Sequence, residues 1–192
     1  MAKDNWAELN TSAPAAAKRL LGALFVRDID GQELIGRIVE TEAYDQTDAA
    51  SHSYRGITPR TEIMFGPPGF LYVYFTYGMH YCCNIVCGPK GRGAAVLLRG
   101  IEPIQGRDMM SALRRNQTVH QLTNGPAKIC QAFGITKSLN GHDLTKIPLR
   151  LRLQAPIEEK DIMTTPRIGI RKAVDVPWRF YLKDNEFVSK SR

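Results

Sequence analysis

The chain of 192 residues has few cysteines, and their spacing excludes two common uses of them. The four are Cys82, Cys83, Cys87 and Cys130, and none forms a Cys-x-x-Cys pair. Neighbouring residues of a strand point to opposite faces, so Cys82 and Cys83 are poorly placed for a shared disulfide or zinc ion. We therefore expect reduced, buried thiols, which are typical of a cytosolic protein.

The sequence also lacks long apolar runs. Residues 1–10 are polar and of mixed charge, without the apolar centre of a signal peptide, and no segment is long enough to span a bilayer. No internal repeat is present, and the glycine-rich stretch 88–93 does not have the spacing of a phosphate-binding loop. These absences predict a cytoplasmic protein that has no membrane partner.

The composition sets the size of the domain and the sign of its charge. The residues are 43% hydrophobic, which predicts a single domain over 1–192, with 1–12 as a candidate flexible segment. The 26 Lys and Arg residues exceed the 19 Asp and Glu residues, for a net charge of +7. This excess favours an anionic polymer over a small anionic metabolite, although solvated lysines would give the same balance.

Two aromatic and β-branched stretches, 71–75 and 81–86, are separated by Tyr77 and a glycine. Glycine tolerates positive φ, so this pattern predicts a β-hairpin with Tyr77 at its turn. Tyr72 and Tyr74 lie two residues apart and share one face of their strand. An aromatic wall beside a tyrosine at a turn indicates recognition of a flat ring; the alternative is an ordinary aromatic core.

Charged residues inside apolar strands mark a second candidate site. Glu40 and Glu42 share a face at the end of one predicted strand. Unless one of them points to solvent, as at an ordinary solvated strand end, packing would raise the pKa of at least one carboxyl group, as a catalytic base requires. Arg99 interrupts an apolar run and needs an anionic partner, such as Glu42 or Glu40. That pair is either structural or orients a water molecule. His52, in a polar loop, could stack on a ring, titrate or bind a metal ion.

Short strands and helices are expected around these features. Thr11 or Ser12 can cap a helix over 15–21, and Asp-Gly at 30–31 is a strong hairpin turn. The further expected elements are strands at 24–29, 33–41, 94–101, 149–153, 168–170 and 179–182, and helices at 105–115 and 127–133.

Four stretches together resemble the alkyladenine, or methylpurine, DNA glycosylase family. They are Glu-Thr-Glu-Ala-Tyr at 40–44, the segment 49–53 with His52, the aromatic hairpin 71–84, and the segment 96–103 with Arg99. The similarity extends from about residue 15 to residue 181, including Asn-Gly-Pro-Ala-Lys at 124–128 and Arg-Ile-Gly at 167–169. The fold that follows is a single α+β domain with a curved antiparallel sheet, short helices around it and a protruding β-hairpin.

The resemblance implies roles for five residues that bind DNA. Tyr77 would enter the duplex in place of a nucleotide that is flipped out. The flipped purine would lie between Tyr44 on one face and His52 with Tyr74 on the other. Asn84 would form the pocket floor and oppose the 2-amino group of normal guanine.

The resemblance also implies the chemistry. Glu42 would deprotonate the attacking water and stabilise the charge that builds up on the sugar, while Arg99 positions that water or Glu42. A main-chain carbonyl near Ile168 would complete the water site. The reaction needs no metal and no cofactor, and it leaves an intact strand with an abasic site.

The expected partner is double-stranded DNA that contains damaged purines, and the protein is expected to act as a monomer in the bacterial cytoplasm or nucleoid. Candidate lesions are 3-methyladenine, 7-methylguanine, hypoxanthine and ethenoadenine. Two other classes of function compete. A non-catalytic nucleic-acid-binding module would use Glu42 and Arg99 as a structural pair. A metal-dependent nuclease would use Glu40, Glu42 and His52 as ligands.

Overall fold

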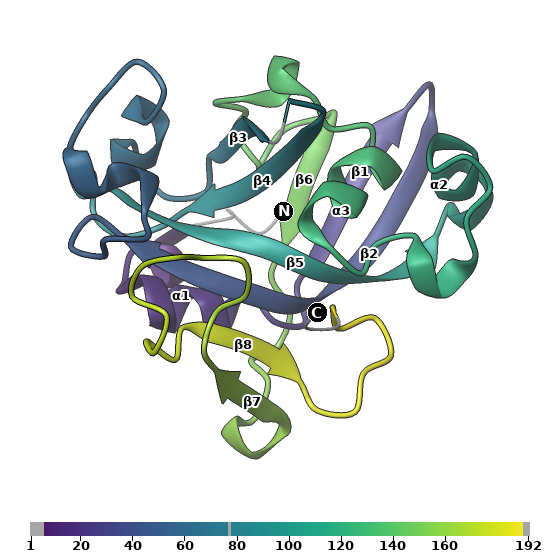
Figure 1. Cartoon of the computed structure of the whole chain (residues 1–192). Coiled ribbons are helices and arrows are strands. Elements are labelled where there is room, and N and C mark those ends of the chain that lie inside the picture. Colours follow the sequence, from purple (N-terminus) through teal and green to yellow (C-terminus); the bar gives the residue numbers. More distant parts are fainter. Residues whose placement is uncertain (1–5, 77, 190–192) are drawn as a thin grey trace.

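A computed structural model describes residues 6–76 and 78–189. This part of the chain forms an eight-stranded antiparallel sheet with short helices around it (Figure 1). The strands are β1 (Leu24–Ile29), β2 (Gln32–Asp45), β3 (Leu71–Thr76), β4 (His80–Val86), β5 (Ala94–Gln105), β6 (Leu149–Arg152), β7 (Ile162–Thr165) and β8 (Arg179–Leu182). The α-helices are α1 (Ala13–Arg19), α2 (Arg107–Leu113) and α3 (Pro126–Ala132), and short 3-10 helices lie at Trp6–Leu9, His52–Arg55, Glu62–Phe65, Val119–Gln121, Lys137–Leu139 and Glu159–Asp161. The expected α+β class is confirmed.

Two long strands, β2 and β5, form the middle of the sheet, whose order is β3-β4-β5-β2-β1-β6. The first part of β2 pairs with β1 across the expected Asp-Gly turn, whereas its later part pairs with β8. In that second pairing Glu40 lies opposite Tyr181, and Glu42 lies opposite Arg179. β7 pairs with the free side of β8 (Figure 1). Both candidate carboxylates therefore lie on the stretch of β2 between β5 and β8.

The core joins the sheet to the helices. Ser12 caps α1 as expected, because its Oγ accepts a hydrogen bond from the Ala15 N–H at 3.4 Å. Phe25 of β1 meets Phe133, which follows α3, edge to face with ring centroids 5.4 Å apart. Leu9, in the first 3-10 helix, is fully buried. Each large apolar side chain buried in this way stabilises the fold by about 1.5–3 kcal/mol, and Ile38 of β2 and Leu98 of β5 belong to the same buried cluster.

The four cysteines are buried and free, as expected. Cys83 packs in the main core, whereas its neighbour Cys82 points to the other face of β4 and lines a cavity. Within residues 6–76 and 78–189, no helix is long and apolar enough to cross a membrane.

The expected strand at 168–170 is wrong. Residues 166–178 form a loop, which passes in front of β2 and β5 in Figure 1. The Ile168 N–H donates to Glu42 Oε1 at 2.8 Å, and the Ile168 carbonyl accepts from Arg99 Nη1 at 3.4 Å. The apolar side chains suggested a strand, but the backbone here pairs with charged side chains and not with another strand.

Candidate active site

Glu42 is fully buried, and three groups from different parts of the chain contact its carboxylate. The Tyr44 hydroxyl donates to Oε2 at 2.8 Å, and the Ile168 N–H donates to Oε1 at 2.8 Å. Arg99 Nη1 lies 3.4 Å from the same Oε1. Alternation along β2 places Glu42 and Tyr44 on one face, and the adjacent β5 supplies Arg99. The structure therefore brings together the two residues that were predicted to be catalytic.

Opposing effects act on the pKa of Glu42. Burial raises this pKa above the usual value of 4.5, and the nearby charge of Glu40 raises it further. The charge of Arg99 and the hydrogen bonds from Ile168 and Tyr44 lower it, but the net shift is upward. A carboxylate with a raised pKa has a greater affinity for a proton, which suits a general base.

Glu40 is equally buried, but its partners differ. Arg179 Nε donates to Oε1 at 2.6 Å, Ser189 Oγ donates to Oε1 at 2.8 Å, and the Ser189 N–H donates to Oε2 at 2.6 Å. Arg99 Nε lies 3.4 Å from Glu40 Oε1, so one guanidinium reaches both carboxylates. Glu40, Arg99, Arg179 and Ser189 therefore form one connected network. Arg179 and Ser189 were not predicted, because only the folded chain brings β8 and the segment after it to β2.

Arg167 lies against the ring of Tyr44. Its guanidinium carbon is 4.7 Å from the Tyr44 ring centroid and 5.5 Å from that of Trp178. Arg167 also donates to the Ala43 carbonyl at 2.9 Å and forms a buried ion pair with Asp48. A guanidinium on a ring face fixes the orientation of that ring. The sequence motif at 167–169 contained this arginine but did not indicate its contact with Tyr44.

A second aromatic wall comes from β3 and the 3-10 helix at His52–Arg55. Tyr72 and Tyr74 share a face as expected, with ring centroids 5.6 Å apart and 26° between the planes. The rings of His52 and Tyr74 meet edge to face, with their centroids 4.6 Å apart, and His52 Nδ1 is 3.0 Å from the Tyr72 hydroxyl. Burial and the charge of Arg60 lower the pKa of His52 to about 4. His52 is therefore neutral at pH 7.

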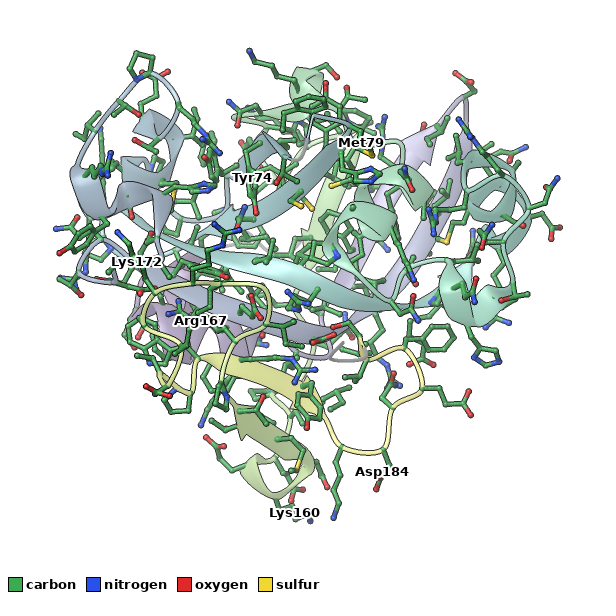
Figure 2. The ribbon with its side chains drawn as sticks, in the orientation of Figure 1. Tyr74, Met79, Lys160, Arg167, Lys172 and Asp184 are labelled. Carbon is green, nitrogen blue, oxygen red and sulfur yellow. The ribbon has the colours of Figure 1, made fainter. Side chains whose placement is uncertain are left out.

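Tyr44 on one side, and His52, Tyr72 and Tyr74 on the other, line one cavity of about 750 Å³. Its lining includes five of the predicted site residues, Tyr44, His52, Tyr74, Asn84 and Arg99. Figure 2 shows Tyr74, from β3, and Arg167, from the loop 166–178, on opposite sides of β5 in that view. Tyr44, Arg99 and Ile168 line the cavity and contact Glu42, which is fully buried and lies directly behind them.

Tyr77 lies outside the described residues, so its position at the turn stays a prediction. The expected hairpin does form, and its last described pair is Thr76 opposite His80. Phe75 and Met79, on either side of the turn, are 52% and 69% exposed. Exposed apolar side chains at the end of a hairpin are suited to contact with another molecule.

Glu40, Glu42 and His52 do not form a cluster of metal ligands. Glu40 is bonded to Arg179 and Ser189, whereas His52 contacts Tyr72. In the described ranges, no group of three or more His, Cys, Asp and Glu side chains could hold a metal ion.

Comparisons with known proteins identify the family of the chain. Residues 7–186 match the model of a family described as methylpurine-DNA glycosylase. A protein of Carboxydothermus hydrogenoformans is 54% identical over 176 residues, which are 91% of this chain and 92% of that protein. A protein of Methanoculleus marisnigri is 48% identical over 177 residues, which are 91% of this chain and 92% of that protein. A protein of Nitrosospira multiformis is 44% identical over 183 residues, which are 95% of this chain and 92% of that protein.

All three relatives carry the name "Putative 3-methyladenine DNA glycosylase". The family match and the identities cover nearly the whole chain, so the resemblance drawn from the sequence motifs is confirmed. The chain therefore belongs to the methylpurine-DNA glycosylase family, hydrolases that act on N-glycosyl bonds in DNA repair.

Proposed function

We propose that this protein is a monofunctional glycosylase of base excision repair, which flips alkylated or deaminated purines out of duplex DNA and hydrolyses their N-glycosidic bond. One observation carries the proposal: the buried carboxylate of Glu42 contacts Arg99 and Tyr44, which both line an aromatic cavity. Membership of the family supports the reaction class. The product is an intact strand with an abasic site.

The cavity supports the binding of one flat base. A flipped purine would lie between the ring of Tyr44 and the wall of His52 and Tyr74. Aromatic faces attract an electron-poor or positively charged purine most strongly, and a neutral His52 does not oppose that charge. Flipping costs a few kcal/mol of unstacking, and a damaged or mispaired base costs least.

The contacts of Glu42 support a role as general base. An ionised carboxylate can accept about four hydrogen bonds, so a water molecule can join the Tyr44 hydroxyl at Oε2. Glu42 takes a proton from this water, the new hydroxyl bonds to the anomeric carbon of the sugar, and the base leaves with the electron pair of the glycosidic bond. Arg99 Nη1 lies 3.4 Å from the Ile168 carbonyl oxygen, and we propose that this donor and this acceptor together orient the water.

Asn84 supports selectivity against normal guanine. It is 5% exposed, and its Nδ2 donates to the Tyr72 carbonyl at 3.4 Å, which fixes the amide on the cavity wall. A 2-amino group directed at this amide would clash or lose its hydrogen bonds to water, whereas adenine-derived bases carry no such group.

The raised pKa of Glu42 leads to a pH prediction. As pH falls through this pKa, Glu42 becomes protonated and can no longer accept a proton from water. We expect the single-turnover excision rate to fall on the acidic side, with a midpoint above 4.5, the usual pKa of Glu. Circular dichroism at each pH separates this loss from unfolding, and a rate that stays constant down to pH 4.5 would exclude Glu42 as the base.

Replacing Tyr77 by Ala tests the proposed insertion into the duplex. We expect weaker binding of lesion-containing DNA and slower excision, because the space left by the flipped nucleotide would not be filled. The thermal unfolding midpoint should change little, since a side chain at a hairpin turn has no core behind it. Fluorescence anisotropy with lesion and undamaged duplexes measures the effect, and unchanged lesion affinity would disprove the role.

Incubation with methylated duplex DNA, followed by chromatography of the released bases, tests the proposed function directly. We expect free methylated purine and an unbroken strand, with and without a chelator. Binding without base release would favour the non-catalytic module, and metal-dependent strand scission without alkali would favour the nuclease.

A further inference from the structure

Ser189 contacts three charged residues at once. Its Oγ donates to Glu40 Oε1 at 2.8 Å and accepts from Arg99 Nη2 at 3.4 Å, while its carbonyl accepts from Arg179 Nη2 at 3.2 Å. The residue is 7% exposed. A hydroxyl can donate one hydrogen bond and accept others, so Ser189 joins an acid and a base that would otherwise share only a long contact.

The segment 183–189 lies directly on β5 beside Arg99. A Cβ atom at Gly100 would be 2.8 Å from the Phe187 carbonyl oxygen and 3.0 Å from Glu40 Cβ, so only glycine permits this close approach. Phe187 is buried, and Asn185 Nδ2 donates to Glu102 Oε2 at 3.1 Å. These contacts fix the position of Ser189 beside Arg99.

Arg99 needs such support on its far side. Its contacts with Glu42 Oε1, the Ile168 carbonyl, Glu40 Oε1 and Ser189 Oγ are all 3.4 Å long, so no single contact holds the guanidinium strongly and its position depends on all of them together. Glu40 and Ser189 contact the opposite edge of the same guanidinium. Removing one of these contacts would let Arg99 turn away from Glu42.

We propose that Ser189 is a positioning residue, which together with Glu40 and Arg179 holds Arg99 against Glu42 and the attacking water. The inference rests on the proposed function. Ser189 is not part of the lining of the aromatic cavity; it lines a second cavity of about 1080 Å³ that shares Arg99 and Ile168 with the first. Its effect is therefore on the rate of the chemical step and not on binding of the base.

The test compares Ser189→Ala with the native protein in single-turnover excision from a hypoxanthine duplex. We expect the rate to fall roughly 10- to 100-fold with lesion affinity unchanged within about twofold, because a small displacement of a catalytic group is costly. The charge of Arg99 lowers the pKa of Glu42, so the acidic limb of the pH–rate profile should also move to higher pH. Ser189→Thr, which keeps the hydroxyl, should restore the rate.

Asp184→Asn is the matched control. Asp184 is exposed on the same segment, its positive φ suits Asn, and Figure 2 shows it at the outer edge of the molecule, away from Arg167. This variant should be as active as the native protein. In a Glu42→Gln background, Ser189→Ala should cause no further loss, because both changes act on the same proton transfer.

Two kinetic results would overturn the inference: a Ser189→Ala rate within twofold of the native rate, or a loss with an unmoved acidic limb that adds fully to that of Glu42→Gln. Hydrogen exchange of the Arg99 guanidinium, followed by NMR, does not depend on activity, and exchange at Nη2, which donates to Ser189 Oγ, should accelerate in Ser189→Ala. A native protein that releases no base would contradict the proposed function, whereas unchanged exchange in the variant would contradict the role of Ser189.

Discussion

Glu42→Gln is expected to reduce single-turnover excision about 10²- to 10⁴-fold, the usual contribution of a general base. The amide has nearly the same shape and can still accept from the Ile168 N–H, but it cannot take a proton from water. Arg99 keeps Glu40 as an anionic partner, so the change does not leave a buried cation unpaired. Binding of lesion DNA and the thermal unfolding midpoint should therefore be retained.

Glu159→Gln is the control for this variant, because Glu159 is an exposed glutamate that pairs with Lys18 far from the cavity. Its excision rate and lesion affinity should match those of the native protein. If Glu42→Gln kept a rate within a few fold of the native rate, the base would have to be Glu40 or another group.

Arg167→Met is expected to lower the free energy of unfolding by about 3–5 kcal/mol. Its ion pair with Asp48 is buried, with side-chain exposures of 0% and 3%. Without the guanidinium, the Asp48 carboxylate would remain buried with no cation, and Tyr44 would lose the group that fixes its ring. We therefore also expect weaker binding of lesion DNA. Urea unfolding measures the first effect and anisotropy the second.

A second substitution separates these two effects. Adding Asp48→Asn removes the unpaired charge and should recover part of the lost stability, but it should not restore lesion affinity. Lys18→Met breaks an exposed pair with Glu159 and should cost less than about 1 kcal/mol. A loss below about 1 kcal/mol for Arg167→Met would show that the buried pair contributes no more than a surface pair.

Local patterns were sufficient to predict much of the fold. The Asp-Gly turn between β1 and β2, the Ser12 cap and the aromatic hairpin each depend on residues that are close in sequence. Alternation likewise placed Glu40 and Glu42 on one face of a predicted strand, whereas the role of Tyr44 followed from the resemblance to the family. Arg99 was conspicuous as a charge within an apolar run.

The remaining parts depend on long-range packing. Three contributors to the site lie in loops: the Ile168 backbone, Arg167 and Ser189. The positions of these loops are set by β8 and the chain after it, so no periodic pattern of apolar residues in the sequence identifies them. The segment 168–170 has the apolar residues of a strand, yet its backbone is better satisfied by Glu42 and Arg99. Sequence patterns report the faces of regular elements and not the partners of loops.

The most direct test of the account is alkali-dependent cleavage of a duplex oligonucleotide with one hypoxanthine or ethenoadenine, in the presence of a chelator. The native protein and Glu42→Gln are compared in parallel. We expect the native protein to produce strand breaks only after alkali, and the variant to bind the duplex but produce almost none. Equal cleavage by both proteins, or breaks without alkali, would contradict hydrolysis by a water that Glu42 activates.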